Sequence, residues 1–281
     1  GKSNILEAIA FGAAASANKL DYEFLGSRGI RATNPEFMYS AFTNGKKKQS
    51  IAVGFVTDEQ EYPYEIENDR NNPKKWIDKN RKKVLGEIDG MMKAIFFEED
   101  EQKRKEIFEE TKENSEIFKN IFKAMKPFRK ENDFKEYLLS INLTILEKAL
   151  SNNSISNYII YSPEQSSLRK FEETTQIYPL GIKGEGLFQF LKELAFEKKN
   201  SKTLNAIKNN LSLLDWYENF ELPENLMKNE YSLRIKDKYL YPKLQYFDQR
   251  STNEGFLFLL FYLTLFIAKA TPVFFAIDNI D

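Results

Sequence analysis

Residues 251 to 278 have the sequence STNEGFLFLLFYLTLFIAKATPVFFAID, and this stretch decides the expected fold. The segment Ser251 to Gly255 has the small polar residues that favour a helix N-terminus, and a long apolar helix is predicted from Glu254. The apolar run Val273 to Ile277 predicts a buried strand, and Asp278 ends it. A helix followed closely by a buried strand favours an α/β sheet, with a carboxylate at the carboxyl end of the strand.

The composition of the chain removes several kinds of chemistry. Its 281 residues include no Cys and no His, which excludes disulfides, thiolate nucleophiles, a Ser-His-Asp triad and most zinc sites within this segment. Basic and acidic residues number 41 and 42, and the net charge of -1 gives no global attraction to nucleic acid or to an anionic membrane. Any chemistry must therefore use carboxylates, Lys, Arg, hydroxyls and backbone amides.

A membrane partner is not expected. The longest uncharged apolar run extends from Phe256 to Ala268, which is shorter than the about 20 residues that a membrane-spanning helix needs. The sequence also does not open with a cationic and then apolar leader. We therefore expect a cytoplasmic protein.

The other end of the chain opens with Gly1-Lys2-Ser3, directly before apolar residues at helical spacing from Ile5 to Phe11. A complete phosphate-binding loop has the pattern G-x-x-x-x-G-K-[ST] between a strand and a helix. Its amides hold the phosphates, its Lys reaches the β- and γ-phosphates, and its hydroxyl binds magnesium. Only the last three positions of that pattern are present, so an ordinary exposed Gly-Lys-Ser is the alternative.

The helix predicted from Glu254 offers a second candidate anion site at its N-terminus, because free amides and the helix dipole favour phosphate there. The alternative is an ordinary helix cap followed by an acidic first turn.

Strands and helices alternate between these two ends. The runs Ser50 to Val56 and Tyr62 to Glu67 predict a hairpin, after an irregular stretch from residue 18 to 45. Residues 74 to 152, rich in Lys, Glu and Phe, predict an insertion of several helices with a solvated charged face. Beyond it we expect strands at 158–161, 231–235 and 239–241 and helices at 187–196 and 204–214.

Together, the motifs at the two ends resemble the ATP-binding heads of the ABC, SMC and RecF superclass. In that group a Ser-rich signature and its helix directly precede the Walker B strand, as Ser251 to Gly255 precede Val273 to Asp278. More narrowly, the chain is similar to AAA-type ATPases of the OLD and RecF-like class, many of them bacterial anti-phage defence proteins such as those of Septu- or PARIS-type systems. The segments Tyr161 to Glu164, Ser167 to Arg169 and Tyr178 to Leu187 are similar to a connecting region of that class.

This resemblance implies an ABC-type P-loop ATPase head with an early β-hairpin subdomain. The head would comprise residues 1–73 and 153–281, and the helical insertion at 74–152 would be its lid or arm. Gly1, Lys2, Ser3 and Asn4 would bind the phosphates of ATP, with Lys2 on the β- and γ-phosphates. Ser3 and Asp278 would hold Mg²⁺.

The signature implies a second subunit. Ser251, Glu254 and Gly255 would lie at the γ-phosphate of ATP bound to that subunit, so the resemblance implies a homodimer or higher oligomer closed around nucleotide. In the resembling defence systems such a head controls an effector protein such as a nuclease, and DNA is a further possible partner.

The chain departs from the family pattern in its catalytic base. The family usually has Glu directly after the Walker B Asp, where this chain has Asn279. An amide can orient water but cannot accept its proton, so we expect slow hydrolysis. Asp281 is the nearest other carboxylate in sequence, but successive residues of an extended strand point in opposite directions, so it is not an obvious substitute. The first half of the phosphate loop is also missing, and we expect these residues to belong to a longer protein.

Two other functions stay open from the sequence. A head that binds ATP but barely hydrolyses it would act as a scaffold for an effector, and Asn279 favours this alternative. A DNA-repair ATPase of RecF type is the other. Tyr239, Tyr241, Tyr246 and Phe247, which alternate with basic residues, could stack on a nucleic acid strand, but we expect them to pack in the core beside the signature helix.

Overall fold

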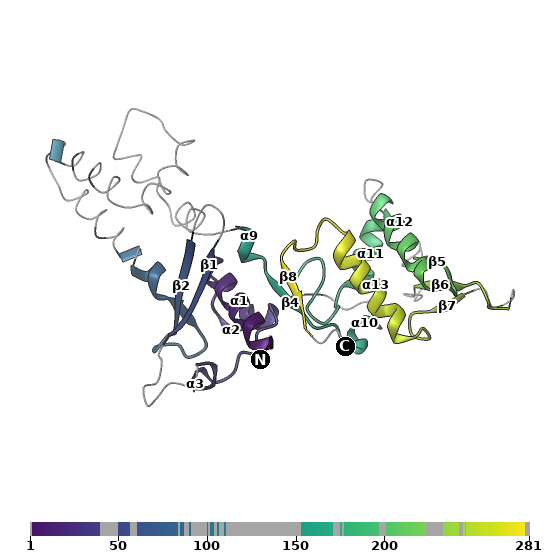
Figure 1. Cartoon of the computed structure of the whole chain (residues 1–281), viewed down its shortest axis with the longest axis horizontal. Coiled ribbons are helices and arrows are strands. Elements are labelled where there is room, and N and C mark those ends of the chain that lie inside the picture. Colours follow the sequence, from purple (N-terminus) through teal and green to yellow (C-terminus); the bar gives the residue numbers. More distant parts are fainter. Residues whose placement is uncertain are drawn as a thin grey trace. The chain divides into compact units, whose positions relative to one another are not determined.

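The computed structural model describes residues 2–39, 50–56, 61–83, 85, 86, 90, 100, 102, 103, 106, 110, 153–170, 175, 177–196, 201–222, 233–241, 244 and 246–278. The chain divides into two compact units, residues 1–26 with 30–158 and residues 27–29 with 159–281, and each unit is described by itself. Both units combine helices with small sheets, which confirms the expected α/β class at this coarse level (Figure 1).

The first unit is built on one long helix and a three-stranded antiparallel sheet with the order β1-β2-β3. Its elements are α1 (Lys2–Ser16), α2 (Tyr22–Ser27), α3 (Pro35–Met38), β1 (Ile51–Val56), β2 (Glu61–Asn68), β3 (Trp76–Asp78) and α9 (Asn153–Ser156). The predicted hairpin is confirmed, with Ile51 opposite Ile66 and Val56 opposite Glu61.

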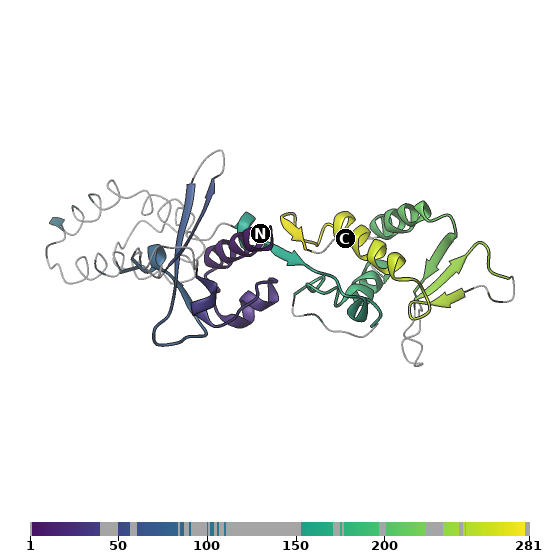
Figure 2. The ribbon, with the colours of Figure 1, turned by 60° about the horizontal axis from the view of Figure 1, so that its bottom comes forward.

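Small side chains let α1 lie close to the sheet (Figure 2). Ala13 is buried, and a Cβ added to Gly12 would come within 2.6 Å of the Phe55 ring. Trp76 of β3 fills the remaining space, with its ring edge-to-face with Phe11 at 5.2 Å between centroids. This interior holds the second half of α1, while the side chains of its first turns stay at least partly accessible.

The expectation of an irregular stretch from 18 to 45 is wrong over the residues described. Helices α2 and α3 both lie there. The side chain of Asn34 accepts a hydrogen bond from the amide of Glu36 at 3.4 Å, and Pro35 follows it in the first turn of α3. Asn followed by Pro is therefore a helix start here, since proline at the first helical position needs no amide partner.

The second unit holds a pair of parallel strands, β4 and β8, and an antiparallel sheet with the order β5-β6-β7. Its elements are β4 (Ile159–Tyr161), α10 (Gln165–Leu168), α11 (Leu187–Phe196), α12 (Ser201–Asn210), the 3₁₀ helix η3 (Leu211–Leu213), β5 (Tyr217–Glu221), β6 (Arg234–Asp237), β7 (Tyr246–Asp248), α13 (Glu254–Ile267) and β8 (Phe275–Ile277).

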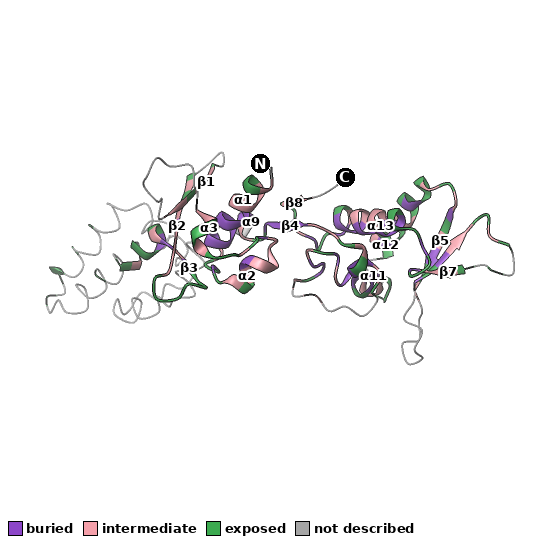
Figure 3. Ribbon diagram, turned by 90° about the horizontal axis from the view of Figure 1, so that it is seen from below, coloured by how far each residue is buried: buried purple, intermediate pink, exposed green. Residues whose placement is uncertain are grey.

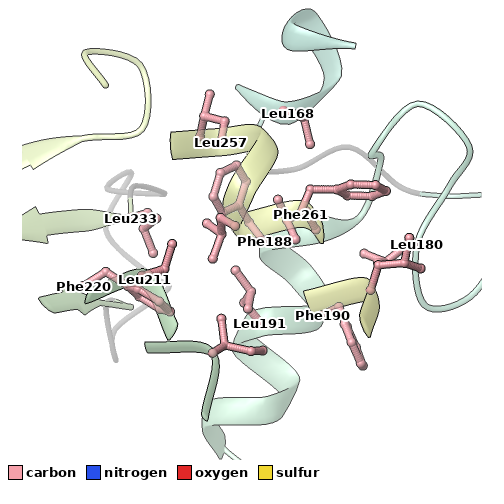
Figure 4. Close-up of a cluster of buried hydrophobic side chains, with 14 of the residues drawn as sticks. Leu168, Leu180, Phe188, Phe190, Leu191, Leu211, Phe220, Leu233, Leu257 and Phe261 are labelled. Carbon is pink, nitrogen blue, oxygen red and sulfur yellow. The ribbon is translucent and has the colours of Figure 1, made fainter. Parts of the chain in front are cut away.

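Helix α13 runs through the core of the second unit, as its apolar sequence requires. Phe256, Leu257 and Phe261 are fully buried, and Figure 4 shows Leu257 and Phe261 in the same cluster as Phe188 and Leu191 of α11. Figure 3 shows this concentration of buried residues on α13. The predicted helix and its start at Glu254 are confirmed.

The predicted strand at 239–241 is wrong. The side chain of Asp237 accepts a hydrogen bond from the Tyr239 amide at 2.8 Å, so the chain turns there and β7 begins only at Tyr246. The predicted helix at 204–214 lies earlier, as α12 from Ser201 to Asn210, and η3 follows it.

The strand before Asp278 is shorter and less buried than predicted. β8 covers only Phe275–Ile277, all partly accessible, and Val273 before it is fully exposed. Within the residues described, β8 pairs with β4 alone, so one edge of the strand has no backbone partner and its side chains are covered incompletely.

Most of the predicted insertion at 74–152 lies outside the described residues, and its opening residues Trp76–Asp78 form β3. Over the part of the chain that is described, no helix combines the length and the apolar character needed to cross a membrane.

Candidate nucleotide-binding site

The Gly-Lys-Ser motif stands at the start of a long helix, as predicted, because α1 begins at Lys2. The first turn of α1 contains no acidic residue, so no side-chain carboxylate of that turn offsets the positive end of the helix dipole. Ser3 is half-buried and Asn4 is exposed. Gly1 and the side chain of Lys2 lie outside the described residues, so their contacts with phosphate stay a prediction.

A pocket of about 350 Å³ lies beside the first three turns of α1, within the first unit. Asn4, Glu7 and Phe11 line it from α1, and Arg31 and Phe37 line it from the segment that leads into α3 and from α3 itself. Glu7 and Arg31 form an ion pair with 2.5 Å between Oε1 and Nε. This pocket was not predicted from the sequence, because it depends on how the segment after α2 returns to α1.

Asp278 stands at the carboxyl end of a parallel strand pair. Its amide donates a hydrogen bond to the carbonyl of Tyr161 at 2.8 Å, directly after β8. Ligands of open α/β sheets bind outside the carboxyl ends of parallel strands, and magnesium in ATP sites is held there by carboxylates. A magnesium role for Asp278 stays a prediction.

The half-buried Arg28 lies beside this strand pair. Burial lowers the pKa of Arg28 and raises that of Tyr161, and the charge of Arg28 partly opposes the rise at Tyr161. The carbonyl of Arg28 accepts a hydrogen bond from the Ile160 amide at 3.1 Å, which fixes the arginine next to β4. Because a guanidinium keeps its proton in proteins, it brings a positive charge close to the strands that precede Asp278. We missed Arg28 in the sequence because it lies in the stretch expected to be irregular.

The turn before α13 is closed by the side chain of Asp248. Its Oδ1 accepts hydrogen bonds from the amides of Arg250 and Ser251 at 3.0 and 2.9 Å, and from the hydroxyl of Ser251 at 2.9 Å. The side chain of Asn253 then accepts from the Phe256 amide at 2.8 Å and caps the helix. The Ser251 hydroxyl is thus used within the turn, and it must leave Asp248 before it can donate to a phosphate.

Arg169 holds the same turn from the other side. Its Nη1 donates to the carbonyls of Gln249 and Arg250 at 3.1 and 2.7 Å. Arg169 follows α10, and α10 follows β4, so one side chain joins the segment after β4 to the start of α13. Arg169 belongs to the connecting region quoted above. Its contacts could not be predicted from local sequence patterns, because the residues that it bonds to lie 80 positions further along the chain.

The structure places the predicted residues in two groups. Ser3 and Asn4 belong to the first unit, whereas Ser251 and Gly255, predicted as signature residues, and Asp278, predicted to end a Walker B strand, belong to the second. Glu254 and Gly255 are exposed in the first turn of α13. A magnesium ion shared by Ser3 and Asp278 stays a prediction. Asn279 and Asp281 lie outside the described residues.

The acidic residues do not supply a metal site by themselves. Among the residues that the structure describes, no group of three or more Asp or Glu side chains is placed to hold an ion. A magnesium site that uses one carboxylate, one hydroxyl and the oxygens of the nucleotide needs no such group, because Mg²⁺ commonly binds through one or two carboxylates and the substrate phosphates.

The aromatic residues near the signature do not all pack as expected. Tyr239 and Tyr241 are 77% and 65% exposed, so core packing is wrong for these two. Phe247 does pack against the core, with its ring 5.8 Å from that of Trp216. The difference follows from the turn at Asp237, which carries the two tyrosines away from the sheet.

Comparison of the chain with models of protein families, with curated proteins and with solved structures gives no match. The case for any function therefore depends on the residues and geometry described above.

Proposed function

We propose that the chain is the ATP-binding head of a slowly hydrolysing ABC- or RecF-like ATPase subunit. The observation that carries the proposal is the order of elements in the second unit. A capped turn containing Ser251 leads into the buried helix α13, which leads into β8, and Asp278 follows β8 at the carboxyl end of a parallel pair. This order of elements resembles the order of signature, helix and Walker B strand in ABC- and RecF-like heads.

In this proposal ATP binds at the N-terminus of α1. The amides of the first turn and the side chain of Lys2 hold the phosphates, and Ser3 and Asp278 hold Mg²⁺ from its two sides. The absence of acidic residues from the first turn of α1 supports this placement, because a carboxylate there would repel the phosphates.

ATP then acts as a ligand that favours association of two heads. Ser251 and Gly255 meet the γ-phosphate bound by the second subunit, with Glu254 beside them, whose carboxylate weakens this contact. An attached effector responds to closure. Such a role requires a difference in affinity between the open and closed states more than it requires fast turnover. We propose anti-phage defence as the setting, with a nuclease as one possible effector.

A second candidate is a scaffold that binds ATP without hydrolysing it. The residue after Asp278 favours it, because Asn279 cannot take a proton from the attacking water. Loss of a general base lowers the rate by about two to four powers of ten. The two candidates share the same nucleotide site and differ only in turnover.

ATP turnover by the protein that carries this chain tests the proposal. The native protein, Lys2→Ala and Lys19→Ala are compared at saturating ATP and magnesium. Lys19 is an exposed lysine whose Nζ lies 5.4 Å from the centroid of the Phe24 ring, and it serves as the matched control. Slow turnover that disappears only in Lys2→Ala is expected.

Two other results are informative. ATP retained by the native protein without turnover selects the scaffold. Absence of both binding and turnover in the native protein contradicts both candidates.

A further inference from the structure

We infer that the pocket beside α1 receives the base of the bound nucleotide, with the ring of Phe37 stacked on it. This inference rests on the proposed ATP site and extends it, because the motifs account only for the phosphates and magnesium. The pocket lies wholly within the first unit, on the helix whose N-terminus carries the Gly-Lys-Ser motif.

The position of the pocket along α1 suits a nucleotide whose phosphates lie at the helix start. Asn4, Glu7 and Phe11 recur at the spacing of one helical face and all line the pocket. At about 1.5 Å per residue, Glu7 and Phe11 lie about 6 and 12 Å along the axis from Ser3. A ligand whose phosphates lie at the first turn and which extends along this face therefore enters the pocket at Asn4 and reaches Glu7 next.

The size of the pocket suits a single ring system, and its lining combines apolar and polar side chains. Its volume of about 350 Å³ is at the small end of the roughly 300–1,000 Å³ found for small-molecule sites. Phe11 and Met38 provide an apolar wall, and Phe11 is itself buried. A nucleotide base suits such a site, because its faces are apolar and its edge carries hydrogen-bonding groups.

Phe37 is the pocket residue whose large apolar side chain is most exposed to water. It is 80% exposed although it is a large aromatic side chain that lines the pocket. Its backbone is fixed in α3, which Asn34 caps and Pro35 opens, so the ring is held at the pocket rather than on a long loop. A base that stacks on this ring would remove one face of the ring and one face of the base from water.

The polar groups of the pocket lie where the edge of a base can meet them. Glu7 and Arg31 are joined by their ion pair, and the Glu7 side chain is only 23% exposed. A carboxylate accepts from up to four directions, so Glu7 can bind Arg31 and still accept from an amino group of the base. The pair therefore offers both an acceptor and a donor without adding net charge to the pocket.

The test separates the base from the phosphates. Dissociation constants for ATP and for inorganic triphosphate, each with magnesium, are measured for the native protein, Phe37→Ala and Ile5→Ala. Ile5 is the matched control, since it is a 65% exposed apolar residue on α1 that does not line the pocket. Phe37→Ala is expected to weaken ATP binding about tenfold, the size of one lost base–aromatic stack, and to leave triphosphate binding unchanged. Ile5→Ala is expected to change neither.

Equal weakening of ATP and triphosphate by Phe37→Ala, or no change in either, overturns the base pocket and leaves the proposed ATP site standing. A native protein that binds neither compound overturns the proposed function, and the base pocket with it.

Discussion

The two helices on which the proposed ATP site depends, α1 and α13, differ in the residues of their first turns. The first turn of α1 has no acidic residue, and the side chains of Ser3, Asn4 and Ile5 are partly or largely accessible, with Ile5 65% exposed. Helix α13 has Asn253 as its cap and Glu254 in its first turn, and Phe256 is already fully buried. The start of α13 is thus bonded by its own chain through Asn253, whereas we propose that the start of α1 binds the phosphates of ATP.

This contrast separates the two expected roles. A nucleotide can use the dipole and amides of α1 without displacing a carboxylate from its first turn. At α13 a phosphate meets Glu254 nearby and a Ser251 hydroxyl that is bonded to Asp248. We therefore expect α1 to bind ATP in a single subunit, and the signature to engage only when a second subunit brings its nucleotide close.

Stability provides the largest expected effect. Phe256→Ala should lower the free energy of unfolding of the second unit by about 3–5 kcal/mol, because it leaves a cavity in a fully buried site. Ile5→Ala should change the stability of the first unit by no more than about 0.5 kcal/mol, since the side chain is mostly exposed. Native-state hydrogen exchange measures each unit separately. Similar losses in the two variants would mean that the first turns of the helices do not differ in burial.

The cap of α13 gives a smaller effect. Asn253→Ala should lower the stability of the second unit by about 1 kcal/mol, because the Phe256 amide loses its 2.8 Å acceptor. The control is Asn34→Ala in α3, where the bond to the Glu36 amide is 3.4 Å and the helix has a single turn. A smaller loss is expected there. Undiminished amide protection in the first turn of α13 after Asn253→Ala would show that the cap contributes nothing.

The sequence predicted the elements whose signals are local. Apolar spacing located α1, a continuous apolar run located α13, and two short β-like runs located the β1–β2 hairpin. The polar residues before Glu254 correctly indicated a helix start, and Asn253 is its cap.

The incorrect predictions have physical causes that the spacing of apolar residues in the sequence does not reveal. The strand expected at Tyr239 became a turn because one aspartate side chain binds a backbone amide two residues later. The strand before Asp278 has the composition of a buried strand, but burial depends on neighbouring strands, and the described residues supply only β4. The contact of Arg169 with the turn before α13 and the pocket at Phe37 both depend on tertiary structure.

The most direct measurement is a double-mutant cycle between Ser3 and Asp278, with the dissociation constant of ATP determined at saturating magnesium. The central claim is that these two residues hold one ion. Ser3→Ala and Asp278→Asn should each weaken ATP binding. The double variant should bind ATP little worse than the single variant with the lower affinity, so that the two changes in binding free energy are coupled by about 1 kcal/mol or more. Losses that simply add, or single variants that bind ATP as well as the native protein does, would contradict the claim.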